Sequence, residues 1–273
     1  MMVGLLAAAA VFAGGAEVLA EGLRGSDGLA LGPDSTLYVC EELAGRVLAL
    51  KGDSQFVVAE GLAHPEGICA LPSGSLLVTE DVMDGRLLRI LPGGGMDVLA
   101  EGLSGPEGVC RLRSGPTAVS WSNAQSGGVP FPLRTGVRAY PEGGDLFARS
   151  TVYSLSDLVC DSSGVLYAAV ESSGILTWHS ILALHPDSAE ARPFSSGLCS
   201  CEGLCTTEGG FPLYAVEEDR GGFGRVVAVE SDGSFRVVAD SLPSAEDVVV
   251  LPDGSLAVSV DGTGEVLRIL LAE

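Results

Sequence analysis

Short apolar runs alternate with turn-forming residues along almost the whole chain. Four runs recur in a fixed order: an opening run such as EGICAL, then runs such as SLLV, GRLLRI and MDVLAEGL. Turns rich in glycine, aspartate and serine, such as LPSG and PGGG, separate them. No long window carries apolar residues at the helical spacing of i, i+3, i+4 and i+7. The pattern therefore predicts short β-strands joined by tight turns.

This unit of four runs occurs six times. The residue that opens each first run is acidic in five units, and in the fourth unit a serine is followed by an aspartate. The opening residues are Asp27, Glu66, Glu107, Ser156 with Asp157, Glu202 and Glu246. Successive openings lie 39, 41, 49, 46 and 44 residues apart, which is the period of propeller blades. The sequence predicts an all-β fold, a six-bladed β-propeller with four antiparallel strands in each blade. A β-sandwich also accounts for short strands, but not for an acid that recurs at regular places.

The two ends of the chain predict how the ring of blades closes. Residues 246–273 supply three strands, and AEVLAEGL at 16–23 copies the fourth-strand sequence MDVLAEGL at 96–103. We therefore expect the N-terminal strand to complete the last blade and leave no unpaired edge. A single propeller domain then spans residues 16–273, and the apolar residues 1–15 lie outside the repeat.

The apolar N-terminal segment is too short to span a bilayer, so we expect no stable transmembrane anchor. The segment resembles a signal peptide, with small residues before a possible cleavage point. A signal peptide, however, begins with lysine or arginine, and neither precedes this apolar run. Four of the seven cysteines share one position in the repeat, which predicts small buried side chains rather than disulfides: Cys69, Cys110, Cys160 and Cys205. These features favour an intracellular location, cytoplasmic or organellar, over secretion. The C-x-C-x-x-x-C spacing of Cys199, Cys201 and Cys205 lacks the fourth ligand of a structural zinc site.

The chain is strongly acidic, with a formal net charge of −21, so nucleic acid and anionic membrane surfaces are not expected partners. In a propeller, the first strand of each blade lines the central channel, and the loop after the second strand returns to the same mouth. Sixteen of the 36 acidic residues fall at these places. Besides the opening acids they are Glu41, Glu42, Glu80, Asp81, Glu171, Glu217, Glu218, Asp219, Asp247 and Asp261.

Carboxylates that converge on one channel repel each other. Retained protons, arginine partners or a bound cation relieve that repulsion. Because the ligands are oxygen atoms, we predict a divalent cation and favour Ca²⁺ or Mg²⁺ over Zn²⁺. Its candidate ligands are Asp27, Glu66, Glu107, Asp157, Glu202 and Glu246. The alternative is that these acids accept hydrogen bonds from backbone N–H groups of neighbouring blades.

Motifs such as PEGICALPSGSLLVTE and SDGLALGPDSTLYV resemble those of the senescence-marker-protein/gluconolactonase family of six-bladed propellers. Wider relatives are paraoxonase-like lactonases, strictosidine-synthase-like proteins and NHL-repeat propellers. The resemblance covers residues 16–273 and is specific for the fold rather than for one activity. It implies a divalent cation at the channel mouth, held at places that correspond here to Asp27, Glu107, Ser156 or Asp157, and Glu202. The family has asparagine at two of these places and this chain has none, so its ring is more acidic.

Two hypotheses for the function follow. The first is a metal-dependent hydrolase of lactones or esters, in which Glu202 or Asp157 moves the proton. Two long insertions would wall its substrate pocket with Trp121, Asn123, Phe131, Trp178 and His179. The second is a non-enzymatic scaffold, monomeric or partner-bound, whose acidic mouth binds a basic protein. An amine-handling enzyme of the strictosidine-synthase type is a further alternative. Serine-hydrolase and nucleotide-binding motifs are absent from the sequence.

Overall fold

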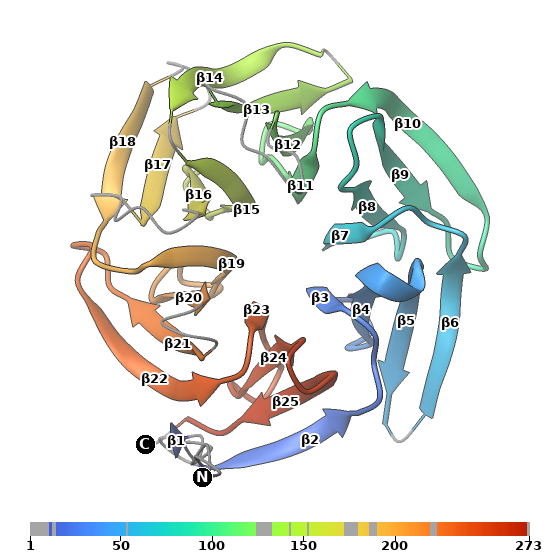
Figure 1. Ribbon diagram of the computed structural model, residues 1–273, viewed down its shortest axis with the longest axis vertical. Coiled ribbons are helices and arrows are strands. Elements are labelled where there is room, and N and C mark those ends of the chain that lie inside the picture. Colours follow the sequence, from blue (N-terminus) through green and yellow to red (C-terminus); the bar gives the residue numbers. More distant parts are fainter. Residues whose placement is uncertain are drawn as a thin grey trace, which may run out of the picture.

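The computed structural model shows six antiparallel sheets arranged like blades around a central axis (Figure 1). It describes residues 11–12, 15–52, 54–123, 133–141, 143–151, 153–171, 180–185, 190–218 and 223–271. Each sheet contains the four strands of one sequence unit, so the predicted six-bladed β-propeller is confirmed.

The first strand of each blade lies nearest the axis and the fourth lies at the circumference (Figure 1). Blade 1 contains β3 (Ser26–Leu31), β4 (Leu37–Glu41), β5 (Arg46–Lys51) and β6 (Ser54–Glu60), with the short 3₁₀ helix η1 (Glu42–Ala44) after β4. Blade 2 contains β7 (Pro65–Ala70), β8 (Leu76–Glu80), β9 (Gly85–Ile90) and β10 (Met96–Leu103). Blade 3 contains β11 (Pro106–Arg111), β12 (Thr117–Ser122), β13 (Leu133–Tyr140) and β14 (Asp145–Thr151).

The second half of the ring repeats this arrangement. Blade 4 contains β15 (Ser154–Cys160), β16 (Leu166–Glu171), β17 (Ile181–His185) and β18 (Glu190–Ser195). Blade 5 contains β19 (Ser200–Thr206), β20 (Leu213–Glu218), β21 (Gly224–Val229) and β22 (Phe235–Leu242). Blade 6 contains β23 (Ala245–Val250), β24 (Leu256–Val260), β25 (Glu265–Ile269) and the N-terminal β2 (Ala16–Ala20).

The ring closes through the N-terminal strand, as the sequence predicts. Strand β2 pairs antiparallel with β25, with Ala16 opposite Ile269 and Val18 opposite Leu267. A short strand, β1 (Val11–Phe12), pairs with β22 and adds a fifth strand to the outer edge of blade 5. None of the helices among the described residues reaches the length and apolarity of a membrane span.

The turn between the first and second strands has the same backbone in several blades, because it needs a residue in the left-handed region. Gly74, Gly164 and Gly254 occupy this position, with φ of 81°, 91° and 85°. In blade 1 the position belongs to Ser35, with φ of 63°. The left-handed backbone conformation of the turn therefore explains the glycines of LPSG, DSSG and LPDG.

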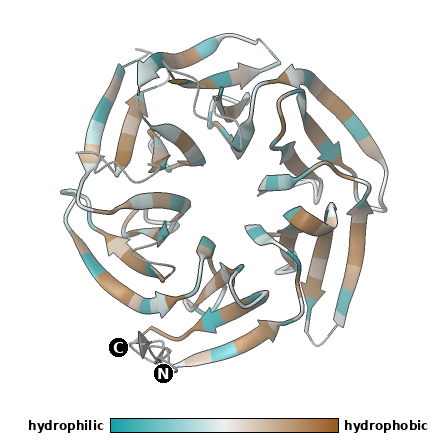
Figure 2. Cartoon of the chain, viewed as in Figure 1, coloured by the Kyte–Doolittle hydropathy of each residue, from teal (hydrophilic) through white to brown (hydrophobic). Residues whose placement is uncertain are grey.

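The core lies between the blades. Each of six clusters of buried apolar side chains combines residues from two successive blades. We call the interface between two neighbouring blades a seam. Successive residues of a strand point to opposite faces of the blade, so Val39 packs in the seam between blades 6 and 1 and Cys40 in the seam between blades 1 and 2. Figure 2 shows the resulting apolar blades, with hydrophilic residues where several inner strands meet the channel. The blades are thus held face to face, and the inner strands are fixed around the axis.

Candidate functional site

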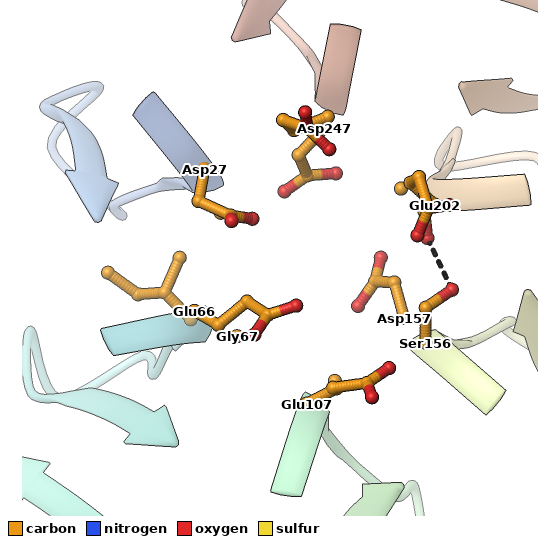
Figure 3. Close-up of a pocket in the computed structure, with 13 residues that line it drawn as sticks. Asp27, Glu66, Gly67, Glu107, Ser156, Asp157, Glu202 and Asp247 are labelled. Atoms are coloured by element: carbon orange, nitrogen blue, oxygen red, sulfur yellow. Dashed lines mark hydrogen bonds between the residues drawn. The ribbon is translucent and has the colours of Figure 1, made fainter. Parts of the chain in front are cut away.

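The inner strands bring the opening residues of all six blades to one pocket on the axis. It is lined by Asp27, Glu66, Glu107, Ser156, Asp157, Glu202, Glu246 and Asp247, together with Gly28, Gly67, Gly108, Gly203 and Ile68. Figure 3 shows carboxyl groups from different blades pointing towards a common centre. All six candidate ligands therefore line this one pocket.

The residue after each opening acid is subject to a steric constraint. In blades 1, 2, 3 and 5 it is glycine, and the strand there abuts the inner strand of the next blade. A Cβ atom on Gly28 would overlap the carbonyl oxygen of Glu66, and one on Gly67 would overlap that of Glu107. These glycines let neighbouring inner strands approach closely enough for the opening acids to converge.

Blades 4 and 6 carry an aspartate where the other blades have this glycine. Asp157 Oδ2 accepts a hydrogen bond from the backbone N–H of Leu204 at 2.9 Å, in the next blade. Asp247 Oδ2 accepts one from Leu29 at 2.7 Å, also in the next blade, and Asp247 Oδ1 accepts one from Val248 at 2.6 Å. We call these two residues the latch aspartates, because each ties its blade to the following one. For Asp157 and Asp247, the alternative prediction therefore holds: their carboxylates accept hydrogen bonds from the backbone N–H groups of a neighbouring blade.

The remaining five acids of the pocket, which we call the ring acids, are Asp27, Glu66, Glu107, Glu202 and Glu246. Glu202 Oε1 accepts a hydrogen bond of 2.8 Å from the Ser200 hydroxyl. The Glu107 side chain is 9% exposed, and no hydrogen bond to its carboxyl group is recorded among the described residues. The ring acids therefore keep most of their carboxyl oxygens directed at the pocket rather than at the protein backbone.

Burial raises the pKa of every carboxyl group in the pocket. The pKa of Glu246 rises to about 8, first through burial and then through repulsion by Glu218 and Asp261. The pKa of Asp157 rises to about 7 through burial, although two backbone N–H groups oppose the shift. For Glu66 and Glu107 the pKa lies well above its ordinary value, with burial as the first cause and neighbouring carboxylates as the next. The pocket is thus a place where negative charge is unfavourable without a positive companion.

A second set of carboxylates lies at or just after the ends of second strands. These rim acids follow or end the second strands, and they raise the pKa of the ring acids by charge repulsion: Glu42, Asp81, Glu171, Glu218 and Asp261. His64 Nδ1 lies 2.7 Å from Glu42 Oε1. Burial and other carboxylates are the main causes of the raised pKa of the ring acids.

Three glutamates of the acidic face have a different role. Glu41, Glu80 and Glu217 are buried and form ion pairs with Arg46, Arg86 and Arg225 of the adjacent third strand. Each also accepts a backbone N–H bond from the loop that leads to a ring acid, from Arg24, Ala63 and Cys199 respectively, at 2.8–2.9 Å. We call these three residues the clamp glutamates. Arginine balances their charge, and they do not line the pocket. They hold the segments that precede Asp27, Glu66 and Glu202.

The donor set fits a hard cation in charge and in ligand type. About 40 Å³ of the pocket is open to water-sized molecules, which is room for roughly three waters at about 10–15 Å³ each, or for one ion. Oxygen-only ligands suit Ca²⁺ or Mg²⁺. In the described part of the chain, no group of three or more His, Cys, Asp or Glu side chains is close enough to hold a metal ion. The carboxyl groups therefore point towards the axis, but no three of them are close enough together to coordinate one ion in this arrangement.

The predicted substrate-wall residues lie elsewhere or outside the described residues. Trp121 lines a separate pocket between blades 2 and 3. The Asn123 side chain accepts a hydrogen bond of 2.6 Å from the backbone N–H of Arg134, which shapes the start of the insertion. Phe131, Trp178 and His179 lie outside the described residues. Cys69, Cys110, Cys160 and Cys205 are unbridged, as the repeat predicts, with Cys110 buried and the other three partly buried.

Solved structures with the same fold have several different activities. A gluconolactonase from Xanthomonas campestris superposes with a TM-score of 0.75 at 18% identity, covering 94% of this chain and 89% of that one. A PQQ-bound aldose sugar dehydrogenase from Streptomyces coelicolor gives 0.69 at 16% identity, covering 97% and 100%. A virginiamycin B lyase from Staphylococcus aureus gives 0.61 at 11% identity, covering 94% and 99%. No protein-family model matches the sequence, and no curated protein matches it significantly. At these identities the likeness concerns the fold alone and assigns no activity to this chain.

Proposed function

We propose that the protein is a divalent-cation-dependent hydrolase that acts on a lactone or ester at the acidic mouth of its channel. The observation that carries the proposal is the convergence of carboxyl groups from six blades on one small pocket, where burial and neighbouring carboxylates raise their pKa. The presence of a gluconolactonase among the structures with this fold supports the reaction class.

The ring acids would hold the cation, because their carboxyl oxygens are directed at the pocket, whereas the latch aspartates already accept backbone N–H bonds. A cation there would polarise the substrate carbonyl and lower the pKa of a water molecule. Glu66, Glu107 and Glu202 come from three different blades, so they would enclose it from several sides (Figure 3).

Glu202 would move the proton. Its Oε1 accepts the Ser200 hydroxyl hydrogen bond, which leaves Oε2 to take or give a proton. Burial and the nearby Glu171 raise its pKa, and a carboxyl group with a raised pKa works as a general acid or base closer to neutral pH. Asp157 is the alternative; its pKa of about 7 suits the role, but its carboxyl group is engaged by backbone N–H groups.

The test is hydrolysis of a panel of lactones and aryl esters by chelator-treated protein with Ca²⁺, Mg²⁺, Mn²⁺ or Zn²⁺ added back. We expect cation-dependent turnover that falls by two to four orders of magnitude in Glu202→Gln, roughly the usual contribution of general acid–base catalysis. Glu208→Gln is the matched control, because Glu208 is an exposed residue in the turn at the far end of β19. Absence of turnover with every cation and substrate would refute the proposal.

A second candidate function is the binding of a basic protein at the same mouth, which the rim acids favour. These five further carboxylates repel the ring acids, so negative charge is not confined to the pocket. Charge-driven binding of this kind should weaken steeply as salt rises from low to physiological ionic strength. Cation binding by the buried ring acids should depend much less on salt.

A further inference from the structure

Blade 3 differs from the rest of the molecule in charge. Residues 106–151 contain five arginines, at positions 111, 113, 134, 138 and 149, and three acids, at 107, 142 and 145, in a chain whose net charge is −21. Each of the other five blades carries more acidic than basic residues. An anion that approaches this protein is therefore repelled by most of its surface and attracted to this blade.

Two of these arginines flank an indole ring. On β13, Arg134, Gly136 and Arg138 alternate along one face of the strand. The Trp121 ring lies on Gly136, where an added Cβ would come within 2.9 Å of Nε1. The guanidinium carbon of Arg134 lies 6.0 Å from the ring centre, and that of Arg138 lies 5.7 Å from it. The glycine thus makes room for a flat apolar surface between two positive charges.

The charge of these arginines is only partly compensated. Arg138 Nε donates a hydrogen bond of 2.7 Å to Asp145 Oδ1. Arg134 is exposed, and no ion pair to its side chain is recorded among the described residues. Arginine presents its donors in a planar fork that suits a carboxylate.

These side chains line an open pocket at the seam between blades 2 and 3. This seam pocket has a volume of about 250 Å³ and is walled by Leu103, Val119, Trp121, Arg134, Arg138 and Tyr140. The seam holds a cluster of five buried apolar residues, against nine to fourteen in the other seams, among the residues that the structure describes. The space is thus bordered by apolar and cationic groups together.

We propose that the seam pocket binds a small organic carboxylate with a flat apolar group. The apolar group would lie against Trp121, Leu103 and Val119, and the carboxylate would contact Arg134 and Arg138. This site is separate from the acidic mouth, and its chemistry is opposite: the ring acids attract cations, whereas the seam pocket attracts an anion. It does not depend on the proposed hydrolase activity.

Nuclear magnetic resonance of the indole N–H groups tests this assignment directly. The chain has two tryptophans, so Trp178→Phe leaves Trp121 as the one indole signal. Benzoate is the probe, and benzamide is its uncharged analogue. Inorganic phosphate tests whether negative charge without an apolar group is enough for binding. All titrations are run at constant ionic strength, because surface electrostatics depend on salt.

We expect a saturable shift of the Trp121 signal with benzoate, and a much weaker one with benzamide or phosphate. Arg134→Gln and Arg138→Gln should each weaken benzoate binding by about tenfold, the loss of one charge-assisted hydrogen bond of about 1.4 kcal/mol. Arg149→Gln is the matched control, since Arg149 is an exposed arginine of the same blade that stacks on Phe147 instead.

The proposal would be overturned by the absence of a saturable shift, by equal shifts with benzoate and benzamide, or by an Arg149→Gln effect as large as that of Arg134→Gln. A shift with phosphate equal to that with benzoate would show an unselective anion effect and would also contradict it. The folded state of each variant is checked from the rest of its spectrum.

Discussion

Asp247 Oδ2 accepts a hydrogen bond of 2.7 Å from the backbone N–H of Leu29, across the seam where the last blade meets the first. The residues are 218 positions apart in the chain, so the bond adds a side-chain tie to the closure made by strand β2. Asp157 makes the equivalent bond from blade 4 to Leu204 of blade 5. Two of the carboxyl groups on the axis therefore hold the ring of blades together.

Asp247→Ala should destabilise the fold by about 1–3 kcal/mol, because it leaves the buried Leu29 N–H without its acceptor. Asp247→Asn should cost less, since an amide oxygen can still accept that bond. Urea unfolding measures both, and Glu208→Ala serves as a surface control. If the alanine and asparagine variants were equally stable, the latch would have no energetic role.

Gly28→Ala should be strongly destabilising, because the added methyl group would overlap the carbonyl oxygen of Glu66 in the next blade. The inner strands would have to separate, at a cost of about 1–3 kcal/mol or more. Gly144→Ala makes the same chemical change where no atom lies within 4 Å of the added carbon. Thermal unfolding of the two variants compares them, and similar losses would show that close strand approach is not the reason for glycine.

The chelator-treated protein should become less stable as pH rises from 5 to 8. The pKa of Asp157 is about 7 and that of Glu246 is about 8 in the folded state, against about 4 in the unfolded chain. Between these values the folded protein binds more protons than the unfolded one, so stability is greatest at the acidic end and falls as pH rises. The pKa of Asp34 and of Asp253 is lowered to about 2, the first mainly by Lys51 and the second mainly by Ser255. Because these pKa values lie below pH 5, the contribution of Asp34 and Asp253 to the free energy of unfolding is constant between pH 5 and pH 8.

Melting temperatures measured from pH 5 to pH 8 test whether stability falls as pH rises. Glu246→Gln should flatten the slope, because an amide does not titrate. A melting temperature that rises from pH 5 to pH 8 in metal-free protein would contradict the raised pKa values of the pocket.

The ion pair between Glu217 and Arg225 provides a test of the clamp glutamates. Arg225→Met should cost about 2–3 kcal/mol, below the 3–5 typical of a fully buried pair, because the arginine side chain is 25% exposed. The double variant Glu217→Gln/Arg225→Met should recover part of that loss, since no buried charge remains. Urea unfolding of the single and double variants measures the coupling, and strict additivity would contradict it.

The sequence predicts the propeller because period, turn chemistry and the copied end strand all agree. It also places five acids and Ser156 around one axis, since each opens the first run of its blade. It does not separate the ring acids from the latch aspartates, although a signal exists. The glycine after the acid, present in EG and DG, is replaced by aspartate in SD at 156–157 and ED at 246–247.

Other features of the site depend on packing that no short motif encodes. Glu41, Glu80 and Glu217 have the same acidic character as the rim acids, but arginines of the third strands neutralise them. The GR dipeptides in the same three blades are the available signal. Trp121 lies at the blade 2–3 seam because its side chain faces Gly136, a contact between strands that the repeat period does not reveal.

Calorimetric titration of chelator-treated protein with Ca²⁺ and Mg²⁺ at pH 7, in two buffers of different ionisation enthalpy, tests the cation site most directly. We predict one cation bound per chain with net release of protons, because carboxyl groups with raised pKa must lose protons to become ligands. Glu66→Gln and Glu107→Gln should each weaken binding and reduce the proton count, whereas Glu208→Gln should change neither. Binding that releases no protons and persists in Glu107→Gln, or the absence of binding by either ion, would contradict a cation held by the ring acids.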